Sequence, residues 1–229
     1  MKTIGVLGGL GPQATMDFES RVHRVAQRLI PPSGNGGYPP MVVYYYRFVP
    51  FVVAETGAPE LPLRPHPRFL DAAAKIGGIA DFIVITSNFL HLFREEIEQA
   101  AGREVVSMID VTVAEVRRRQ WRRIGVSGFG QPLVYTMPLE AAGLATETIV
   151  GESRERLDRA IEKVMEGRDD EGSASAAREA VGELRARPVD GIILGCTEIP
   201  LLLGDAACDP DLVNPLQLLA DAAVNHALT

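Results

Sequence analysis

The sequence predicts an α/β protein made of two similar halves, each built on a mainly parallel sheet. Apolar runs of strand length alternate with helical patterns along the chain, which is typical of right-handed βαβ units. Two strand-to-helix junctions also share one pattern, an apolar run that stops at small polar residues: Phe82-Ile-Val-Ile-Thr-Ser-Asn-Phe-Leu-His91 and Gly191-Ile-Ile-Leu-Gly-Cys-Thr-Glu-Ile-Pro200. Open α/β sheets present functional side chains at such strand ends. Because the two junctions lie half a chain apart, we expect two halves that face one another across a cleft.

The first half opens with a predicted strand at residues 3–7 and a helix at 12–29, whose first turn accommodates Pro12. Residues 31–40, with four prolines and three glycines, are expected to form a loop. The connection 49–67 is long and proline-rich, which is typical of a lid or a binding loop. The same patterns predict the other elements of this half: strands at 41–48, 81–86 and 105–108, and helices at 68–76 and 88–101.

The second half repeats this alternation after a predicted domain boundary near Ser107. We expect an N-terminal α/β domain at 1–106, a C-terminal α/β domain at 107–213, and a final helix within 214–229 that packs back on the first domain. Residues 167–175 are acidic and rich in small side chains, which indicates a surface linker. The predicted elements are strands at 123–126, 145–150 and 189–194, and helices at 111–120, 133–142, 153–165, 176–186 and 215–227.

The composition is that of a folded globular protein and disfavours several classes of partner. The chain has 229 residues, of which 46% are hydrophobic and 23% charged, and its net charge is −7. This acidic balance argues against nucleic acid or an anionic membrane, and no apolar stretch approaches the ~20 residues of a membrane helix. With two cysteines and no signal-peptide pattern, a cytoplasmic location is expected. One basic cluster is interpreted as a solvated helix end and turn: Arg117, Arg118, Arg119, Arg122 and Arg123.

The glycine-rich turn Gly8-Gly-Leu-Gly-Pro-Gln-Ala14 has three interpretations. Its spacing fits the dinucleotide fingerprint G-x-G-x-x-G/A. That fingerprint requires a carboxylate at the end of the second strand, where this chain has Arg47, which could meet a 2′-phosphate instead. More generally, Gly9 and Gly11 would let backbone N–H groups at a helix N-terminus bind a carboxylate or phosphate. A tight turn without any ligand is the third possibility.

The polar residues of the two junctions also have purely structural explanations when each is taken alone. A cysteine such as Cys196 at a strand end is more often a small buried side chain than a nucleophile. Ser87 and Asn88 could simply cap the next helix, and His91 could be a solvated or hydrogen-bonded histidine. The paired arrangement of the junctions favours a function more strongly than any single residue does.

Three motifs in the chain are similar to those of one enzyme superfamily. Ile4-Gly-Val-Leu-Gly-Gly-Leu-Gly-Pro12 looks like an opening G-I-L-G-G-M-G-P, and Thr86-Ser-Asn-Phe-Leu-His91 looks like C-N-T-x-H with serine in place of cysteine. Ile193-Leu-Gly-Cys-Thr-Glu-Ile-Pro-Leu-Leu202 matches G-C-T-E. The chain thus resembles the aspartate/glutamate racemase superfamily, the cofactor-independent amino-acid racemases, in motifs, element order and length. The resemblance implies two pseudo-symmetric three-layer domains with mainly parallel sheets and an active site in the inter-domain cleft.

The resemblance implies a PLP-independent racemase of an acidic or related small amino acid. Such an enzyme removes the α-proton on one face and returns it on the other, here with Cys196 on one face and Ser87 on the other. A thiol suits this task because a helix N-terminus can lower its pKa from about 8.5 into the working range. The resemblance also implies supporting roles: His91 and Glu198 beside the proton-transfer groups, Asn88 and Thr197 as ligands of the substrate carboxylate or amine, Gly9 and Gly11 in the anion turn, and Arg47 as a side-chain carboxylate clamp.

The chain departs from the family pattern at two places. The glycine-threonine segment becomes Ser127-Gly-Phe-Gly-Gln-Pro132, which puts Gln131 near the threonine position as a substrate-binding candidate. Ser87 replaces the first cysteine, and an alcohol is a far weaker acid than a thiol. Two alternatives therefore stay open: a single-cysteine decarboxylase or cis-trans isomerase of small dicarboxylates, and a non-catalytic carboxylate-binding relative.

The expected partner is a small amino acid or dicarboxylate. The resemblance implies no cofactor and a homodimer. No histidine, cysteine and carboxylate cluster has the spacing of metal ligands, so no metal is expected, and Cys208 is interpreted as incidental. The loop 49–67 is expected to select the substrate side chain.

Overall fold

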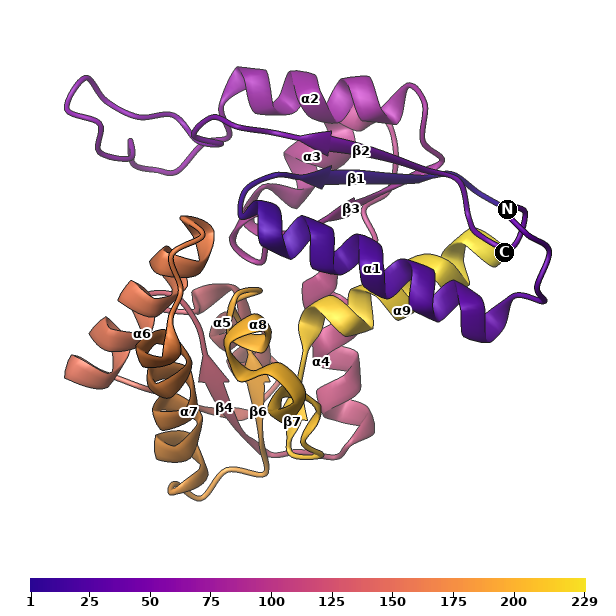
Figure 1. Cartoon of the computed structure of the whole chain (residues 1–229). Coiled ribbons are helices and arrows are strands. Elements are labelled where there is room, and N and C mark those ends of the chain that lie inside the picture. Colours follow the sequence, from indigo (N-terminus) through magenta and orange to yellow (C-terminus); the bar gives the residue numbers. More distant parts are fainter. The chain divides into compact units, whose positions relative to one another are not determined.

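The computed structural model describes all residues from Met1 to Thr229, and the chain divides into two compact units. Unit 1 comprises Met1–Ser107 and Leu219–Thr229, and unit 2 comprises Met108–Leu218. Each unit contains one parallel sheet covered by helices (Figure 1), which confirms the predicted α/β class. No helix combines the length and the apolar character needed to cross a membrane.

The sheet of unit 1 has three strands, β1 (Ile4–Gly8), β2 (Met41–Tyr45) and β3 (Phe82–Ile85). Their order is β2-β1-β3, and both neighbouring pairs are parallel. Parallel neighbours require a crossover connection, which α1 (Pro12–Leu29) and α2 (Pro67–Gly77) supply. The carboxyl ends of the three strands therefore meet at one edge of the sheet.

Helices cover both faces of this sheet, with α2 and α3 (Arg94–Ala101) on one face and α1 and α9 (Pro215–Leu228) on the other (Figure 1). Successive residues of β3 face opposite layers. Ile83 packs with the apolar side chains of α2 and α3. The ring of Phe82 contacts His226 of α9, with 4.5 Å between the ring centroids. Because both faces are buried, the strand is apolar throughout rather than alternating.

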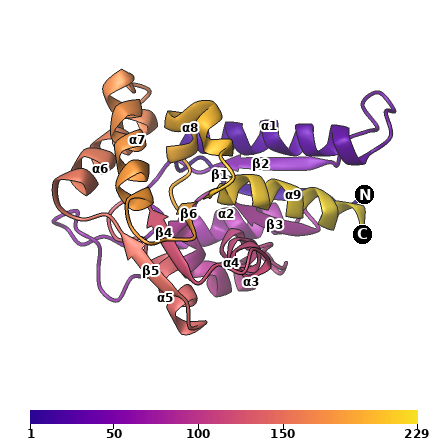
Figure 2. The ribbon, with the colours of Figure 1, turned by 90° about the horizontal axis from the view of Figure 1, so that it is seen from below.

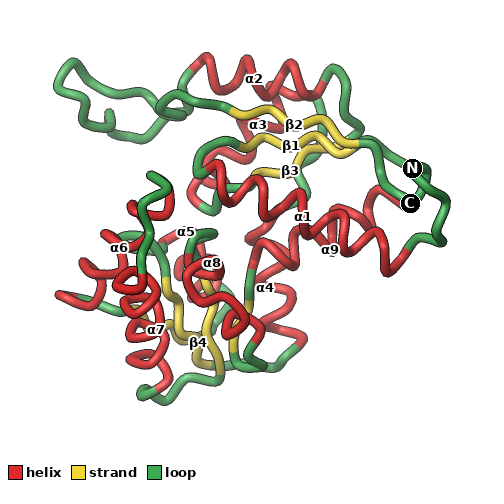
Figure 3. Tube along the Cα trace, viewed as in Figure 1, coloured by secondary structure: helices red, strands yellow, loops and turns green.

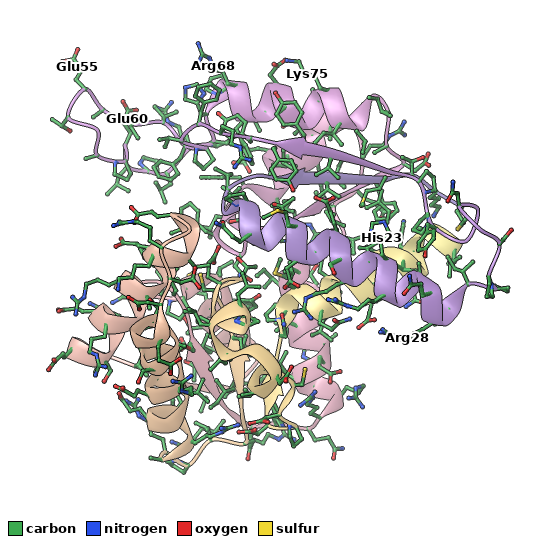
Figure 4. The ribbon with its side chains drawn as sticks, viewed as in Figure 1. His23, Arg28, Glu55, Glu60, Arg68 and Lys75 are labelled. Atoms are coloured by element: carbon green, nitrogen blue, oxygen red, sulfur yellow. The ribbon has the colours of Figure 1, made fainter.

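Charged side chains lie on the outer surfaces of these helices. Arg68 and Lys75 of α2 point away from the sheet (Figure 4), and Lys75 forms an exposed ion pair with Asp71 one turn earlier. Arg28 of α1 forms an ion pair with Asp221 of α9, with 3.2 Å between Nη2 and Oδ1. Polar outer faces and apolar inner faces account for the helical periodicity of the sequence.

Residues 46–66, between β2 and α2, form an extended arm rather than a compact loop (Figure 3). Isolated antiparallel bridges join Phe51 to Pro65 and Val53 to Pro59, so the arm doubles back on itself. Its role as a lid or binding loop stays a prediction.

The sheet of unit 2 has the strand order β5-β4-β6-β7, and all neighbours are parallel. Its strands are β4 (Arg123–Ser127), β5 (Ala145–Thr148), β6 (Gly191–Leu194) and β7 (Leu212–Val213). Its four longest helices are α4 (Met108–Arg118), α5 (Leu133–Ala141), α6 (Gly151–Met165) and α7 (Glu171–Arg185).

Two cores flank this second sheet. Ile193 of β6 packs with side chains of α4 and α5, whereas Ile192 and Leu194 pack with side chains of α6 and α7. Figure 2 shows α6 and α7 side by side. The period-2 alternation of a single strand thus supplies both cores, as in unit 1.

The two sheets repeat one design. The first strand of each half lies between the second and the third, as β2-β1-β3 and as β5-β4-β6. The last residue pairs of the first and third strands are Leu7 with Ile85 and Ser127 with Leu194. This shared topology is the predicted pseudo-symmetry.

Two sequence predictions about local structure were wrong. The expected strand at 105–108 is reduced to one parallel bridge between Val105 and Ile83, because α4 already begins at Met108.

The expected linker at 167–175 contains the start of α7. Asp170 and Ser173 form a reciprocal capping box, in which the Asp170 carboxylate accepts the Ser173 N–H at 2.8 Å. The polar composition of this segment therefore marks a helix cap. The short helix α8 (Ile199–Leu203) was not predicted, and the helix expected from residue 88 begins as a 3-10 turn at Phe89–Phe93.

Candidate active site

Unit 1 places six candidate residues around the carboxyl ends of β1, β2 and β3: Gly9, Gly11, Arg47, Ser87, Asn88 and His91. Ser87 follows β3 by two residues and is half-buried, whereas Asn88 is 7% exposed. The strand end thus leaves a hydroxyl within reach of solvent and an amide beside it that is packed in place.

His91 contacts the backbone of Ser87. Its Nδ1 lies 2.9 Å from the Ser87 carbonyl oxygen, and His91 is 9% exposed. Because a carbonyl oxygen can only accept, Nδ1 carries the hydrogen and donates it. The histidine therefore holds the main chain that presents the serine hydroxyl.

The glycine turn after β1 is fixed by a network of buried threonines. Gly9 and Gly11 have φ angles of 86° and 84°, in the left-handed region that favours glycine. A side chain at Gly9 would lie 2.7 Å from the backbone of Tyr45. The Gly9 N–H donates to Thr15 Oγ1 at 2.9 Å, so this donor is already occupied. Close packing against β2 explains why position 9 is a glycine. Because its N–H is already bonded to Thr15, this N–H cannot be one of the donors that bind an anion.

Arg47 lies next to the glycine turn. Its guanidinium donates to the Gly9 carbonyl oxygen at 3.3 Å and stacks over the Tyr45 ring, with 5.0 Å from Cζ to the ring centroid. The residue is exposed. The turn and Tyr45 together orient a planar cation that can grip a carboxylate in two places.

Unit 2 places Cys196, Thr197 and Glu198 directly after β6. Cys196 follows β6 by two residues, the same offset as Ser87 after β3. The thiol donates a hydrogen bond to Glu198 Oε2 at 3.0 Å, and Thr197 Oγ1 donates to the same oxygen at 3.0 Å. Thr197 and Glu198 are 6% and 3% exposed, so the carboxylate is a buried acceptor beneath the thiol.

The electrostatics of this pair differ from the sequence-based expectation. Burial, followed by the neighbouring Glu198 charge, raises the pKa of the Cys196 thiol well above its usual value. Backbone N–H groups of Phe129 and Glu198 act in the opposite direction but do not prevail. The expected lowering by a helix N-terminus was wrong, because α8 is only five residues long and the nearest charge is a carboxylate. Burial also raises the pKa of Glu198.

Close packing brings the end of β6 against the end of β4. The Gly195 N–H donates to the Ser127 carbonyl oxygen at 2.6 Å, and a side chain at Gly195 would lie 2.9 Å from that oxygen. Gln131 follows in the loop 128–132 and is exposed. Phe129 of the same loop contacts the thiol through its N–H. No three histidine, cysteine or carboxylate side chains are grouped as metal ligands.

Sequence reasoning missed Thr15 and Phe129. Thr15 Oγ1 lies 2.9 Å from Thr86 Oγ1, which links the glycine turn to the residue before Ser87. The sequence did contain one signal for Thr15, which is its position in the first turn of a helix that follows a glycine turn. Phe129 acts through its backbone, which no sequence pattern identifies.

The two units thus repeat one α/β design, with a thiol after β6 in one and a hydroxyl at the matching position after β3 in the other. The chain belongs to the Asp/Glu/Hydantoin racemase family, whose sequence profile matches residues 7–223. It is therefore a member of a family of isomerases, and the resemblance described above is confirmed.

Individual relatives agree with this membership over the whole chain. The broad specificity amino-acid racemase RacX of Bacillus subtilis (strain 168) is 22% identical over 228 residues, which cover 98% of each chain. The aspartate racemase of Picrophilus torridus has a TM-score of 0.78 at 18% identity, covering 99% of this chain and 94% of that one. PH1733, an aspartate racemase homologue from Pyrococcus horikoshii OT3, has a TM-score of 0.75 at 21% identity with both chains fully covered. These structures share the fold.

Proposed function

We propose that the protein is a PLP-independent racemase of an acidic or related small amino acid, with Cys196 acting on one face of the substrate Cα and Ser87 on the other. The observation that carries the proposal is the matched placement of the two side chains, each two residues beyond the last register pair of its sheet. Family membership supports the racemase class. The similarity to RacX, named as an amino-acid racemase, supports an amino-acid substrate.

The contact between Cys196 and Glu198 supplies the proton movement on the thiol face. Glu198 accepts the thiol proton along the 3.0 Å hydrogen bond, and the thiolate then takes the α-proton. The C–H electron pair stays on the substrate, delocalised into its carboxyl group. In the reverse direction the thiol returns a proton to the carbon and Glu198 gives its proton back to the sulfur. A buried carboxylate with a raised pKa is a better base than an exposed one.

Ser87 serves the opposite face. Its hydroxyl is a weak acid and a weak base, so proton transfer at Ser87 is expected to be the slower of the two. We propose that His91 keeps the serine in position through the backbone contact described above. The enzyme should therefore exchange the α-proton of one enantiomer faster than it inverts it.

The remaining candidates are proposed to hold the substrate. Arg47, oriented by the Gly9 turn, would bind the side-chain carboxylate. Asn88 and Thr197 would bind the α-carboxylate or the amine. Gly11 would shape the turn, and Gln131 would contact the substrate from the loop after β4. A homodimer in the cytoplasm stays a prediction.

The test compares two cysteine variants in a chiral assay of aspartate and glutamate. Cys196→Ala should abolish both α-proton exchange and inversion, whereas Cys208→Ala, at the other and exposed cysteine, should retain both. Ser87→Ala should abolish inversion but keep exchange of one enantiomer, and Ser87→Cys should accelerate inversion because a thiol is the stronger acid.

A Cys196→Ala protein that racemises at the wild-type rate would refute the proposal. Turnover of a malonate- or maleate-type acid without any inversion would replace it by the decarboxylase or cis-trans isomerase.

A further inference from the structure

Unit 2 contains a cavity of about 300 Å³ that shares only Gln131 with the residues proposed for the reaction. It lies between the loop 128–132, α5, β5 and the first turn of α6, and its size is that of a small-molecule site. Thr136, Thr146 and Thr148 are among the side chains that line it. Cys196, Thr197 and Glu198 are not among them.

The cavity contains a cation without an internal partner. Arg154 lines it from the first turn of α6, and its Nε is buried and has no hydrogen-bond partner. A buried donor that lacks an acceptor destabilises the folded protein. The position is also unfavourable for a cation, because the N-terminus of a helix carries positive partial charge. Arg156, two residues on, shows the contrast, since it forms an ion pair with Glu179.

The helix N-terminus beside Arg154 also lacks an acceptor. Val150 occupies the capping position of α6 and no side chain caps the first N–H groups. Two independent features, a buried guanidinium nitrogen of the half-buried Arg154 and an uncapped helix end, thus favour a negatively charged group at the same wall of the cavity.

An isolated carboxylate lines the same cavity. Glu140 comes from α5, and its Oε1 accepts a hydrogen bond from the hydroxyl of Thr146 rather than pairing with a cation. A simple anion bound at Arg154 would share the cavity with this negative charge. A ligand that carries both an anion and a cation would satisfy Arg154 and Glu140 together.

We propose that this cavity is a second binding site for a free amino acid, with the ligand carboxylate on Arg154 and the start of α6 and the ligand ammonium on Glu140. The threonine hydroxyls supply neutral hydrogen bonds. The proposal concerns ligand binding and goes beyond the proposed racemase reaction. An experiment can therefore refute one of the two proposals without refuting the other.

The same loop joins this cavity to the thiol. Gly130 and Gln131 line the cavity, and Phe129 donates its N–H to Cys196. Asp158 of α6 accepts the Gly130 N–H at 2.8 Å, which ties the loop to the helix that carries Arg154. A ligand in the cavity is therefore placed to act on the loop behind the thiol, as an effector would.

The experiment is a titration of the full-length ¹⁵N-labelled protein followed by amide NMR. Glycine is the probe because it carries both charges and cannot be racemised; acetate and methylammonium each carry one of them. Glycine should produce saturable shifts at the amides of Gly130, Gly151 and Arg154, with a smaller shift at Phe129. Acetate and methylammonium should bind at least about tenfold more weakly, because each leaves one charged group unpaired.

Substitutions at Arg154 and at Glu140, with Arg156→Met as the control, test whether glycine binds in the cavity. Arg154→Met should weaken glycine binding at these amides by about tenfold or more, while Arg156→Met, which removes the same charge from the same helix, should leave it unchanged. In Glu140→Gln the preference for glycine over acetate should reverse, and acetate should bind more tightly than it binds to the wild type. The unperturbed part of each spectrum reports that the variant is folded.

Three results would overturn the assignment. Absence of saturable shifts at the cavity amides would remove the site. Equal effects of Arg154→Met and Arg156→Met would remove the role of Arg154. Acetate that binds the wild type as well as glycine does would exclude a zwitterionic ligand.

Discussion

Thr15 ties the glycine turn to the strand end that carries Ser87, and its replacement by valine tests this link. The hydroxyl of Thr15 accepts the Gly9 N–H at 2.9 Å and lies 2.9 Å from the Thr86 hydroxyl. Both threonines are at most 1% exposed, so water cannot replace a lost partner. Thr15→Val keeps the shape and leaves two buried polar groups unsatisfied, each at a cost of about 1–3 kcal/mol. The free energy of unfolding is expected to fall by about 2–4 kcal/mol. This is less than the summed cost of two unsatisfied groups, because the Thr86 hydroxyl can rotate towards another acceptor.

Thr15→Ser is the matched control, because it keeps the hydroxyl and removes one methyl group, worth roughly 1 kcal/mol. Urea unfolding followed by far-UV circular dichroism measures both variants, since the single tryptophan, Trp121, lies in unit 2 and does not report on unit 1. The valine variant should also lose activity more than the serine variant, because the turn beside Arg47 is released. If Thr15→Val is no less stable than Thr15→Ser, the hydrogen-bond network does not fix the turn.

Two further predictions concern packing and pH. Gly195→Ala should destabilise the protein by about 1–3 kcal/mol, because the new Cβ would lie 2.9 Å from the Ser127 carbonyl oxygen. Gly182→Ala, in a helix with open space at this point, should instead stabilise by about 0.4–1 kcal/mol, and a urea titration of both variants checks the opposite signs. Hydrogen bonds from Arg118 and Arg119 lower the pKa of Glu115 from 4.5 to about 2. The stabilisation that ionised Glu115 provides is therefore complete above pH 4.5 and is lost as the pH falls to about 2. In Glu115→Gln, the free energy of unfolding should decrease less steeply between pH 4.5 and about 2 than it does in the wild type.

Much of the fold was predictable because burial on both faces makes the strands apolar throughout. The runs that became β3 and β6 show this directly, and the glycine turn before α1 was equally clear. The short strand β7 and the helix α8 were missed, because two and five residues are too few to show a period. The capping box of α7 was mistaken for a linker, since the side chains that start a helix also favour loops.

The candidate site was predictable in its residues but not in its electrostatics. Cys196 and Glu198 are close in the sequence, yet only the structure shows the thiol donating to the carboxylate, with Glu198 buried and Cys196 half-buried. A sequence pattern carries no information on burial at a loop of this kind, so the direction of the thiol pKa was wrongly expected. The cavity beside Arg154 depends on residues from three elements and left no local signal.

The most direct test of the central claim is proton NMR of the protein in D₂O with each enantiomer of aspartate and of glutamate, following the α-proton signal. We predict that one enantiomer loses its α-proton rapidly, through Cys196, and that its mirror image appears more slowly because Ser87 limits inversion. Exchange that persists unchanged in Cys196→Ala, or no exchange with any of the four amino acids, would contradict the account.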